Sequence, residues 1–186
     1  MVAFGLYVGF CYYKGRETEE VETVDEEKDQ QSEDEKKLGS VPTRVLVMRT
    51  LRNMGCTPVV GERGNIHFDY QGEHFFIAAN NDCRFIEIYD TWWGRLSMGD
   101  DIETFAWMQK AVNQVNTSSS CTVLYSYDYE EREVGVHTRQ NLLFIEQIPD
   151  IERYLVAMLN GFFKAQRDVK TEIEKYRKLD EQRVKR

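Results

Sequence analysis

The chain has 186 residues, of which 41% are hydrophobic and 12% aromatic, so it can form one domain core with an extension but is too short for two ordinary domains. The net charge of −8 is concentrated in residues 17–35, which hold eleven Asp and Glu against one Lys, whereas residues 40–186 hold 19 Lys and Arg against 21 Asp and Glu. This nearly neutral domain lacks the strongly basic surface on which nucleic-acid binding depends, and we expect no nucleic-acid partner.

The first 13 residues carry no charge, and Lys14 and Arg16 follow at once. Such a run is shorter than the about 20 apolar residues that span a bilayer. Tyr12 and Tyr13 before the basic residues resemble an interfacial belt with a positive cytoplasmic flank. We therefore interpret residues 1–13 as the end of a membrane anchor whose start lies upstream, which would tether the domain to the cytoplasmic face of the inner membrane. The alternative is a hydrophobic terminus with no membrane role.

Residues 14–40 are rich in Glu, Asp, Gln, Lys and Ser and contain no aromatic residue. They cannot bury enough apolar surface to offset the entropy of ordering, which predicts an acidic disordered linker. The four cysteines occur singly, without a Cys-x-x-Cys pair. This pattern predicts reduced thiols and a cytoplasmic location.

Hydrophobic periodicity and turn residues predict three helices and seven strands over residues 41–186. In chain order we expect a helix at 42–54, strands at 57–61, 65–70, 73–79 and 83–89, a helix at 100–116, strands at 121–128, 132–138 and 141–146, and a long helix from 149 that becomes highly charged from 164 onward. The order α-β-β-β-β-α-β-β-β-α predicts an α+β fold, with helices packed on one face of an antiparallel sheet.

Several strings within residues 41–165 resemble the YbjN family of proposed bacterial sensory-transduction regulators. The strings that carry the resemblance are 65–77, 83–89, 121–127, a helix ending in Ala111, Asn113 and Asn116, and the closing amphipathic helix. The resemblance implies a fold like that of the type III secretion chaperones, and hence protein binding rather than chemistry. No catalytic motif of that family is known to us, so no residue of this chain inherits a catalytic role.

The most unusual string of the domain, residues 90–96, links a predicted strand to the second helix and contains Trp92, Trp93 and Arg95. Tryptophan and arginine are enriched in binding hot spots because they bury much surface with few rotatable bonds. We predict that these three residues contact a protein partner, while at least one indole covers the edge of the core.

A second candidate site lies on the hairpin formed around Gln71 and Gly72. A two-residue loop there pairs Asp69 with His74, and alternation places His67 on the same face. Two imidazoles and a carboxylate could bind a divalent metal or share a proton. One face of an antiparallel sheet is commonly solvated, however, and we predict that these residues form such a face without a metal.

The sequence contains no phosphate-binding loop, no Gly-x-Ser-x-Gly elbow and no His-Glu-x-x-His string. We therefore predict a non-catalytic protein-binding or regulatory module, chaperone-like, with no cofactor, no small-molecule substrate identified, and a protein, a peptide or a second copy of the chain as partner. Two alternatives remain open at this point. One is a metal-binding protein or enzyme that uses His67, Asp69 and His74, and the other is a structural subunit of a larger assembly.

Overall fold

The computed structural model describes residues 41–100 and 102–184. The chain divides into two units, Met1–Gly39 and Ser40–Arg186, and the description below concerns the second unit. The predicted apolar segment 1–13 and acidic linker 14–40 lie outside the described residues. The helices within 41–100 and 102–184 do not combine the length and the apolar composition needed to cross a bilayer.

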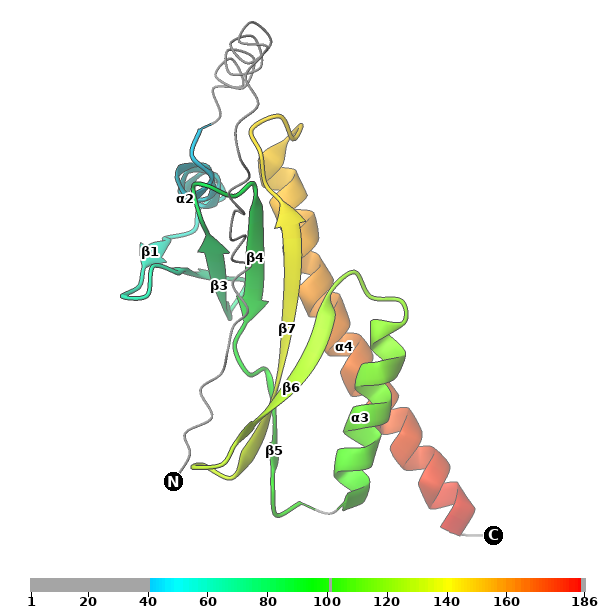
Figure 1. Ribbon diagram of the computed structural model, residues 1–186. Coiled ribbons are helices and arrows are strands. Elements are labelled where there is room, and N and C mark those ends of the chain that lie inside the picture. Colours follow the sequence, from blue (N-terminus) through cyan, green and yellow to red (C-terminus); the bar gives the residue numbers. More distant parts are fainter. Residues whose placement is uncertain (1–40, 101, 185–186) are drawn as a thin grey trace, which may run out of the picture. The chain divides into compact units, whose positions relative to one another are not determined.

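Three helices and seven strands make up the described domain (Figure 1). They are α2 (Thr43–Asn53), β1 (Val59–Val60), β2 (Ile66–Tyr70), β3 (Glu73–Ala79), β4 (Phe85–Asp90), β5 (Gly94–Ser97), α3 (Ile102–Asn116), β6 (Thr122–Asp128), β7 (Glu133–Leu143) and α4 (Ile151–Val184). The alternation of helices and strands and the α+β class agree with the expectation from the sequence.

The strands form one antiparallel sheet in which β7 contacts three other strands. β6 pairs with residues 133–139 of β7 along one edge. β4 and β5 pair with β7 along the opposite edge, one after the other, because β6 already occupies the first edge. The sheet continues from β4 through β3 and β2 to the two-residue strand β1.

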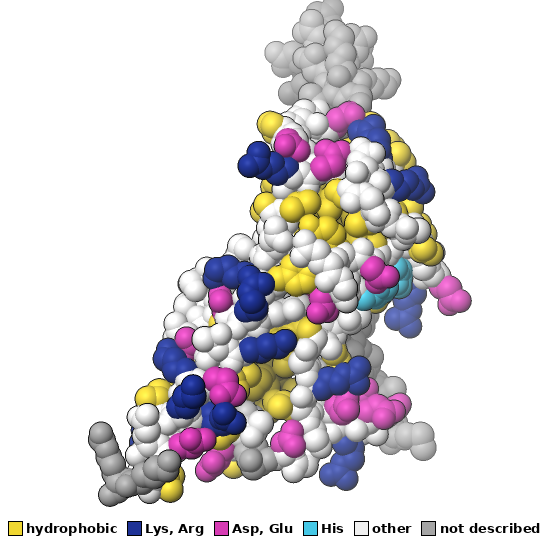
Figure 2. Space-filling view, turned by 180° about the vertical axis from the view of Figure 1, so that it is seen from behind, with side chains coloured by type: hydrophobic (Ala, Val, Ile, Leu, Met, Phe, Trp, Pro, Cys, Tyr) yellow, Lys and Arg dark blue, Asp and Glu magenta, His cyan; other side chains and the backbone are white. Residues whose placement is uncertain are grey.

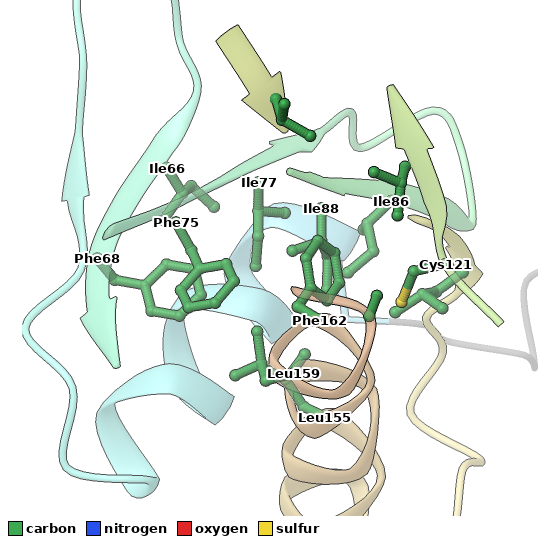
Figure 3. Close-up of a cluster of buried hydrophobic side chains, with 14 of the residues drawn as sticks. Ile66, Phe68, Phe75, Ile77, Ile86, Ile88, Cys121, Leu155, Leu159 and Phe162 are labelled. Atoms are coloured by element: carbon green, nitrogen blue, oxygen red, sulfur yellow. The ribbon is translucent and has the colours of Figure 1, made fainter. Parts of the chain in front are cut away.

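The hydrophobic core lies between one face of this sheet and the helices, as Figure 3 shows. Alternate side chains of β2, β3 and β4 are fully buried on this core face, as strands that pack on one side require. Phe75 of β3 meets Phe162 of α4 edge to face, with ring centroids 5.5 Å apart. Leu155 and Leu159 of α4 are also fully buried. The expected packing of helices on one sheet face is therefore observed.

Two details of the sheet differ from the expectation. The strands predicted at 132–138 and 141–146 are one continuous strand, β7, because Arg139 projects to the solvated face and pairs with Tyr89 without interrupting the ladder. A short strand, β5, lies inside the segment that was expected to be a loop.

Within α3, Ile102 is 84% exposed and does not continue the apolar stripe that the helical spacing predicts.

The charged part of α4 is stabilised by ion pairs along its own surface. α4 runs for 34 residues, and Figure 2 shows basic and acidic side chains mixed along the part of the molecule that leads to the C-terminus. The pairs within the helix are Lys164–Asp168, Glu172–Lys175, Glu174–Arg177, Arg177–Glu181 and Asp180–Arg183. Trp107 of α3 also donates a hydrogen bond to Asp180, at 2.7 Å, which holds the second half of α4 against α3.

We predict that Phe75→Ala lowers the free energy of unfolding by about 3–5 kcal/mol, because it removes a fully buried ring and leaves a cavity against Phe162. Phe85→Ala is the matched control, since Phe85 lies on a neighbouring strand but is 59% exposed. Urea unfolding monitored by circular dichroism measures both. Equal losses in the two variants would contradict the assignment of the core face.

Candidate functional site

The segment between β4 and β5 forms a wide bulge against β7. Tyr89 is the last residue of β4 to pair with β7, opposite Arg139, and Gly94 is the first of β5, opposite Val136. Residues 90–93 therefore lie opposite only residues 137 and 138. Bulges of this kind redirect side chains and increase the local twist. Here the bulge determines where the two tryptophans and Asp90 lie.

Trp93 faces the core side of the sheet. Its indole Nε1 donates a hydrogen bond to Oγ1 of the fully buried Thr138, at 2.9 Å. The ring is partly buried against the hydrophobic core, and the Lys170 ammonium of α4 lies 5.8 Å from its centroid. The expectation that one indole covers the edge of the core is confirmed by this residue.

Trp92 covers the opposite face of the sheet, which we call the outer face. Its ring lies directly on Gly135 of β7, where a Cβ atom would come within 1.9 Å of Trp92 Cδ2. The Arg95 guanidinium stacks at 5.5 Å from a Trp92 ring centroid and also pairs with Glu133 at 3.1 Å. The structure thus brings Trp92 and Arg95 together and places Trp93 on the other side of the sheet.

Asp90 is a buried carboxyl group that the sequence pattern does not mark as a site residue. It is 3% exposed. Its Oδ1 accepts a hydrogen bond from the backbone N–H of Thr138, and its Oδ2 accepts one from Nε2 of Gln166 at 3.1 Å. Burial raises the pKa of Asp90 to about 7, although the hydrogen bonds from Thr138 and Gln166 oppose this shift and the nearby Glu73 adds to it.

Asp90 connects three elements through these bonds. Thr138 lies on β7 and Gln166 on α4, and Thr138 also accepts the Trp93 indole N–H. The position could have been found from the alternation of β4. Ile86, Ile88 and Asp90 share the core face of that strand, so a polar residue at the third position has to find partners inside the protein.

The hairpin of β2 and β3 has the predicted register, with Asp69 opposite His74. His74 Nδ1 lies 2.7 Å from Asp69 Oδ1, and the His67 and His74 rings are 5.9 Å apart. Both imidazoles pack against Phe76, at 4.5 and 4.9 Å between ring centroids. Across the described ranges, no three His, Cys, Asp or Glu side chains are placed to hold a metal ion. In the structure both histidines pack on Phe76, and His74 also pairs with Asp69.

No protein-family description matches the chain, and no curated protein matches it. Among solved structures, the crystal structure of YbjN from E. coli, described as a proposed transcription regulator, is similar over 72% of this chain and 90% of that chain. The sequence identity is 9% and the TM-score 0.42. At this similarity, no residue of this chain receives a role from YbjN.

We predict that Asp90→Asn flattens the pH dependence of stability. Because the pKa of Asp90 is higher in the folded than in the unfolded chain, its contribution to stability is fully present below about pH 4 and is lost as the pH rises through about 7. At pH 8 the wild type should have lost up to about 4 kcal/mol of unfolding free energy that the amide variant keeps. Gln166 can turn its amide and donate or accept as needed.

Urea unfolding at pH 5 and pH 8 measures the larger part of this loss, about 3 kcal/mol, with Asp82→Asn as an exposed control. Curves for wild type and Asp90→Asn that run parallel between these pH values would show that Asp90 is ionised in the folded protein throughout the range.

We also predict that His67→Ala and His74→Ala leave the metal content of the purified chain unchanged and lower its stability by about 1 kcal/mol each, through lost contact with Phe76. Elemental analysis after dialysis is the measurement. Stoichiometric metal in the wild type that disappears in both variants would instead identify a metal site at these histidines.

Proposed function

We propose that the described domain is a non-catalytic protein-binding module that docks its partner on the outer face of the sheet. The observation that carries the proposal is the set of apolar side chains exposed on this face. Phe85 of β4 is 59% exposed and Leu143 of β7, directly opposite, is 39% exposed. Val59 of β1, which is 60% exposed, lies on the same face three strands away from Phe85. Neighbouring exposed apolar groups such as Phe85 and Leu143 are typical of interaction surfaces.

The aromatic residues of the outer face add the chemistry of a binding hot spot. Phe76 and Tyr89 stack on neighbouring strands with ring centroids 5.0 Å apart and an interplanar angle of 5°. Phe85 pairs with Leu143 and Trp92 lies on Gly135, and these two positions of β7 are eight residues apart, about 26 Å at roughly 3.3 Å per residue. This length suits an interface of ordinary size, in which a few aromatic and arginine side chains contribute most of the binding free energy.

Trp92 and Arg95 supply the anchor at one end of this surface. Because Gly135 has no side chain, the Trp92 ring can lie directly on the strand, and the ion pair with Glu133 orients Arg95. A ring and a guanidinium that are already positioned lose little conformational entropy when a partner binds. The ion pair between Arg139 and Glu87 on the same face would belong to the polar rim.

We predict that Trp92→Ala reduces recovery of native partners by at least about tenfold while lowering stability by only about 1 kcal/mol. Trp93→Phe should lower stability but keep partner recovery. It removes the indole donor of the Thr138 hydroxyl in the core and does not change the outer face. The measurement is a pull-down with the tagged full chain from native extract, combined with thermal unfolding of each variant.

Phe85→Ala and Leu179→Ala form a matched pair for the same experiment. Both side chains are exposed, at 59% and 45%, but Leu179 lies on α4 and not on the outer face. Phe85→Ala should reduce the recovery of the partner, and Leu179→Ala should leave this recovery unchanged. If folded Trp92→Ala and Phe85→Ala both recover the partners of the wild type, the outer face is not the docking surface. Recovery of this chain alone would identify a second copy as the partner.

A further inference from the structure

β6 is an edge strand, because its pairing within the described part of the chain is with β7 only. The direction in which the backbone groups of β6 point follows from that of their partners in β7. Thr138 directs its N–H to Asp90, on the β4 side, so its neighbour His137 directs its backbone groups to β6. His137 pairs with Leu124. Val123, Tyr125 and Tyr127 therefore point their N–H and C=O groups away from β7, along the free edge.

The backbone groups of Val123, the first of these three residues, already have a partner within the protein. The Asn116 side chain, at the end of α3, donates from Nδ2 to the Val123 carbonyl at 3.0 Å. Its Oδ1 accepts from the Val123 N–H at 2.9 Å. A side-chain amide that satisfies both backbone groups of one residue imitates a neighbouring strand, and it confirms that Val123 faces the edge.

The edge is open at Tyr125 and Tyr127. No described residue forms a hydrogen bond with the outward backbone groups of these two tyrosines, and Figure 1 shows β6 running away from α3 toward its turn with β7. Seven residues of edge strand without Pro, Lys or a bulge would normally be a liability for aggregation. Pairing with another chain would satisfy the open groups.

A ladder of aromatic rings lies beside this open edge. Phe105 of α3 contacts Tyr125 and Tyr127 at 5.8 and 6.1 Å between centroids. Tyr127 stacks on Tyr129 at 5.9 Å. Tyr127 is 44% and Tyr129 77% exposed, whereas Gln109 anchors Tyr125 through its hydroxyl at 3.1 Å. The ladder offers apolar contact to alternate side chains of an added strand.

The turn at the open end is acidic. Asp128, Glu130 and Glu131 accompany a single Arg132, and Glu133, which follows, pairs with Arg95. The Asp128 carboxylate accepts the backbone N–H groups of Glu130 and Glu131, both at 3.0 Å, so the chain is turned back sharply with its carboxylates at the tip. A segment bound here meets negative charge, which favours Lys and Arg in that segment.

We propose that residues 125–128 of β6 bind an extended, basic segment of a partner protein as an added strand. Backbone hydrogen bonds to Tyr125 and Tyr127 supply the pairing, the aromatic ladder receives the alternate apolar side chains, and the acidic turn selects basic residues. Asn116 sets one limit of the bound segment, because a strand that extended past Val123 would have to displace its amide. A second copy of β6 carries the same acidic turn and no Lys or Arg of its own over 122–128, so it lacks the complementary charge.

The test uses the full chain and a synthetic peptide of about eight residues in which Lys and Val alternate, with blocked ends. Tyr127→Pro removes an outward N–H but no hydrogen bond to β7, which is the setting in which an edge strand tolerates proline. Tyr127→Val is the matched variant that keeps the N–H and removes the ring. Peptide affinity is measured by titration, and amide hydrogen exchange of Tyr125 and Tyr127 reports where the peptide pairs.

We expect the wild type to bind the peptide with slowed exchange of the Tyr125 and Tyr127 amides. Tyr127→Pro should lower the affinity about tenfold or more, and Tyr127→Val should lower it less. A peptide N-methylated at alternate residues, or one with Glu in place of Lys, should also bind about tenfold more weakly. No binding by the wild type, or unchanged affinity in folded Tyr127→Pro or for the methylated peptide, overturns the proposal. Self-association of the wild type that Tyr127→Pro abolishes would also overturn it in favour of a second copy.

This inference goes beyond the docking surface of the outer face and fails separately from it. Trp92→Ala leaves the β6 edge unchanged, so it should bind the peptide as the wild type does. If Trp92→Ala loses the peptide while Tyr127→Pro keeps it, the peptide binds the outer face, and the proposal for the edge is wrong while that for the outer face stands.

Discussion

The pairing of β7 with strands on both of its edges is the constraint from which most features of this domain follow. β7 accepts β6 on one side and β4 followed by β5 on the other. Its residues therefore set the register of the whole second half of the sheet. The strand can be this long because its polar residues, such as Arg139, alternate onto the solvated face while Val134, Val136, Thr138 and Leu142 remain buried. The register change between β4 and β5 forces the bulge, and the bulge distributes Trp92 and Trp93 to opposite faces.

Asp90, which lies between the parts of β7 that pair with β4 and with β5, compensates for the interrupted hydrogen-bond ladder. Where β4 leaves β7, the Asp90 carboxylate replaces a backbone carbonyl as acceptor for the Thr138 N–H. The same carboxylate binds Gln166, so the sheet and α4 are joined by a buried hydrogen bond as well as by apolar contact. A carboxyl in this position is costly to ionise, and its protonation state influences how firmly β4, β7 and α4 hold together. The bulge therefore contains a carboxyl group whose pKa burial raises to about 7.

The two proposed binding surfaces differ in the interactions that they offer. The outer face offers side chains, with aromatic rings and a guanidinium held by a glycine contact and an ion pair, and suits a folded or helical partner surface. The β6 edge offers backbone groups first and side chains second, and suits an extended segment. Both surfaces depend on β7, which carries Gly135 beneath Trp92 and holds β6 so that Tyr125 and Tyr127 face outward.

The sequence by itself determined the features that depend on neighbours along the chain. Apolar spacing located all three helices, and the loop at Gln71 and Gly72 determined the β2–β3 register, because periodicity and turn geometry act over a few residues. It also identified Trp92, Trp93 and Arg95 as unusual. Only the tertiary structure decided which tryptophan faces the core, because that depends on a register change against β7 some 45 residues away. The partners of Asp90 and the open edge of β6 are likewise products of long-range pairing, in which Thr138, Gln166 and Asn116 contribute groups that no local pattern assigns to them.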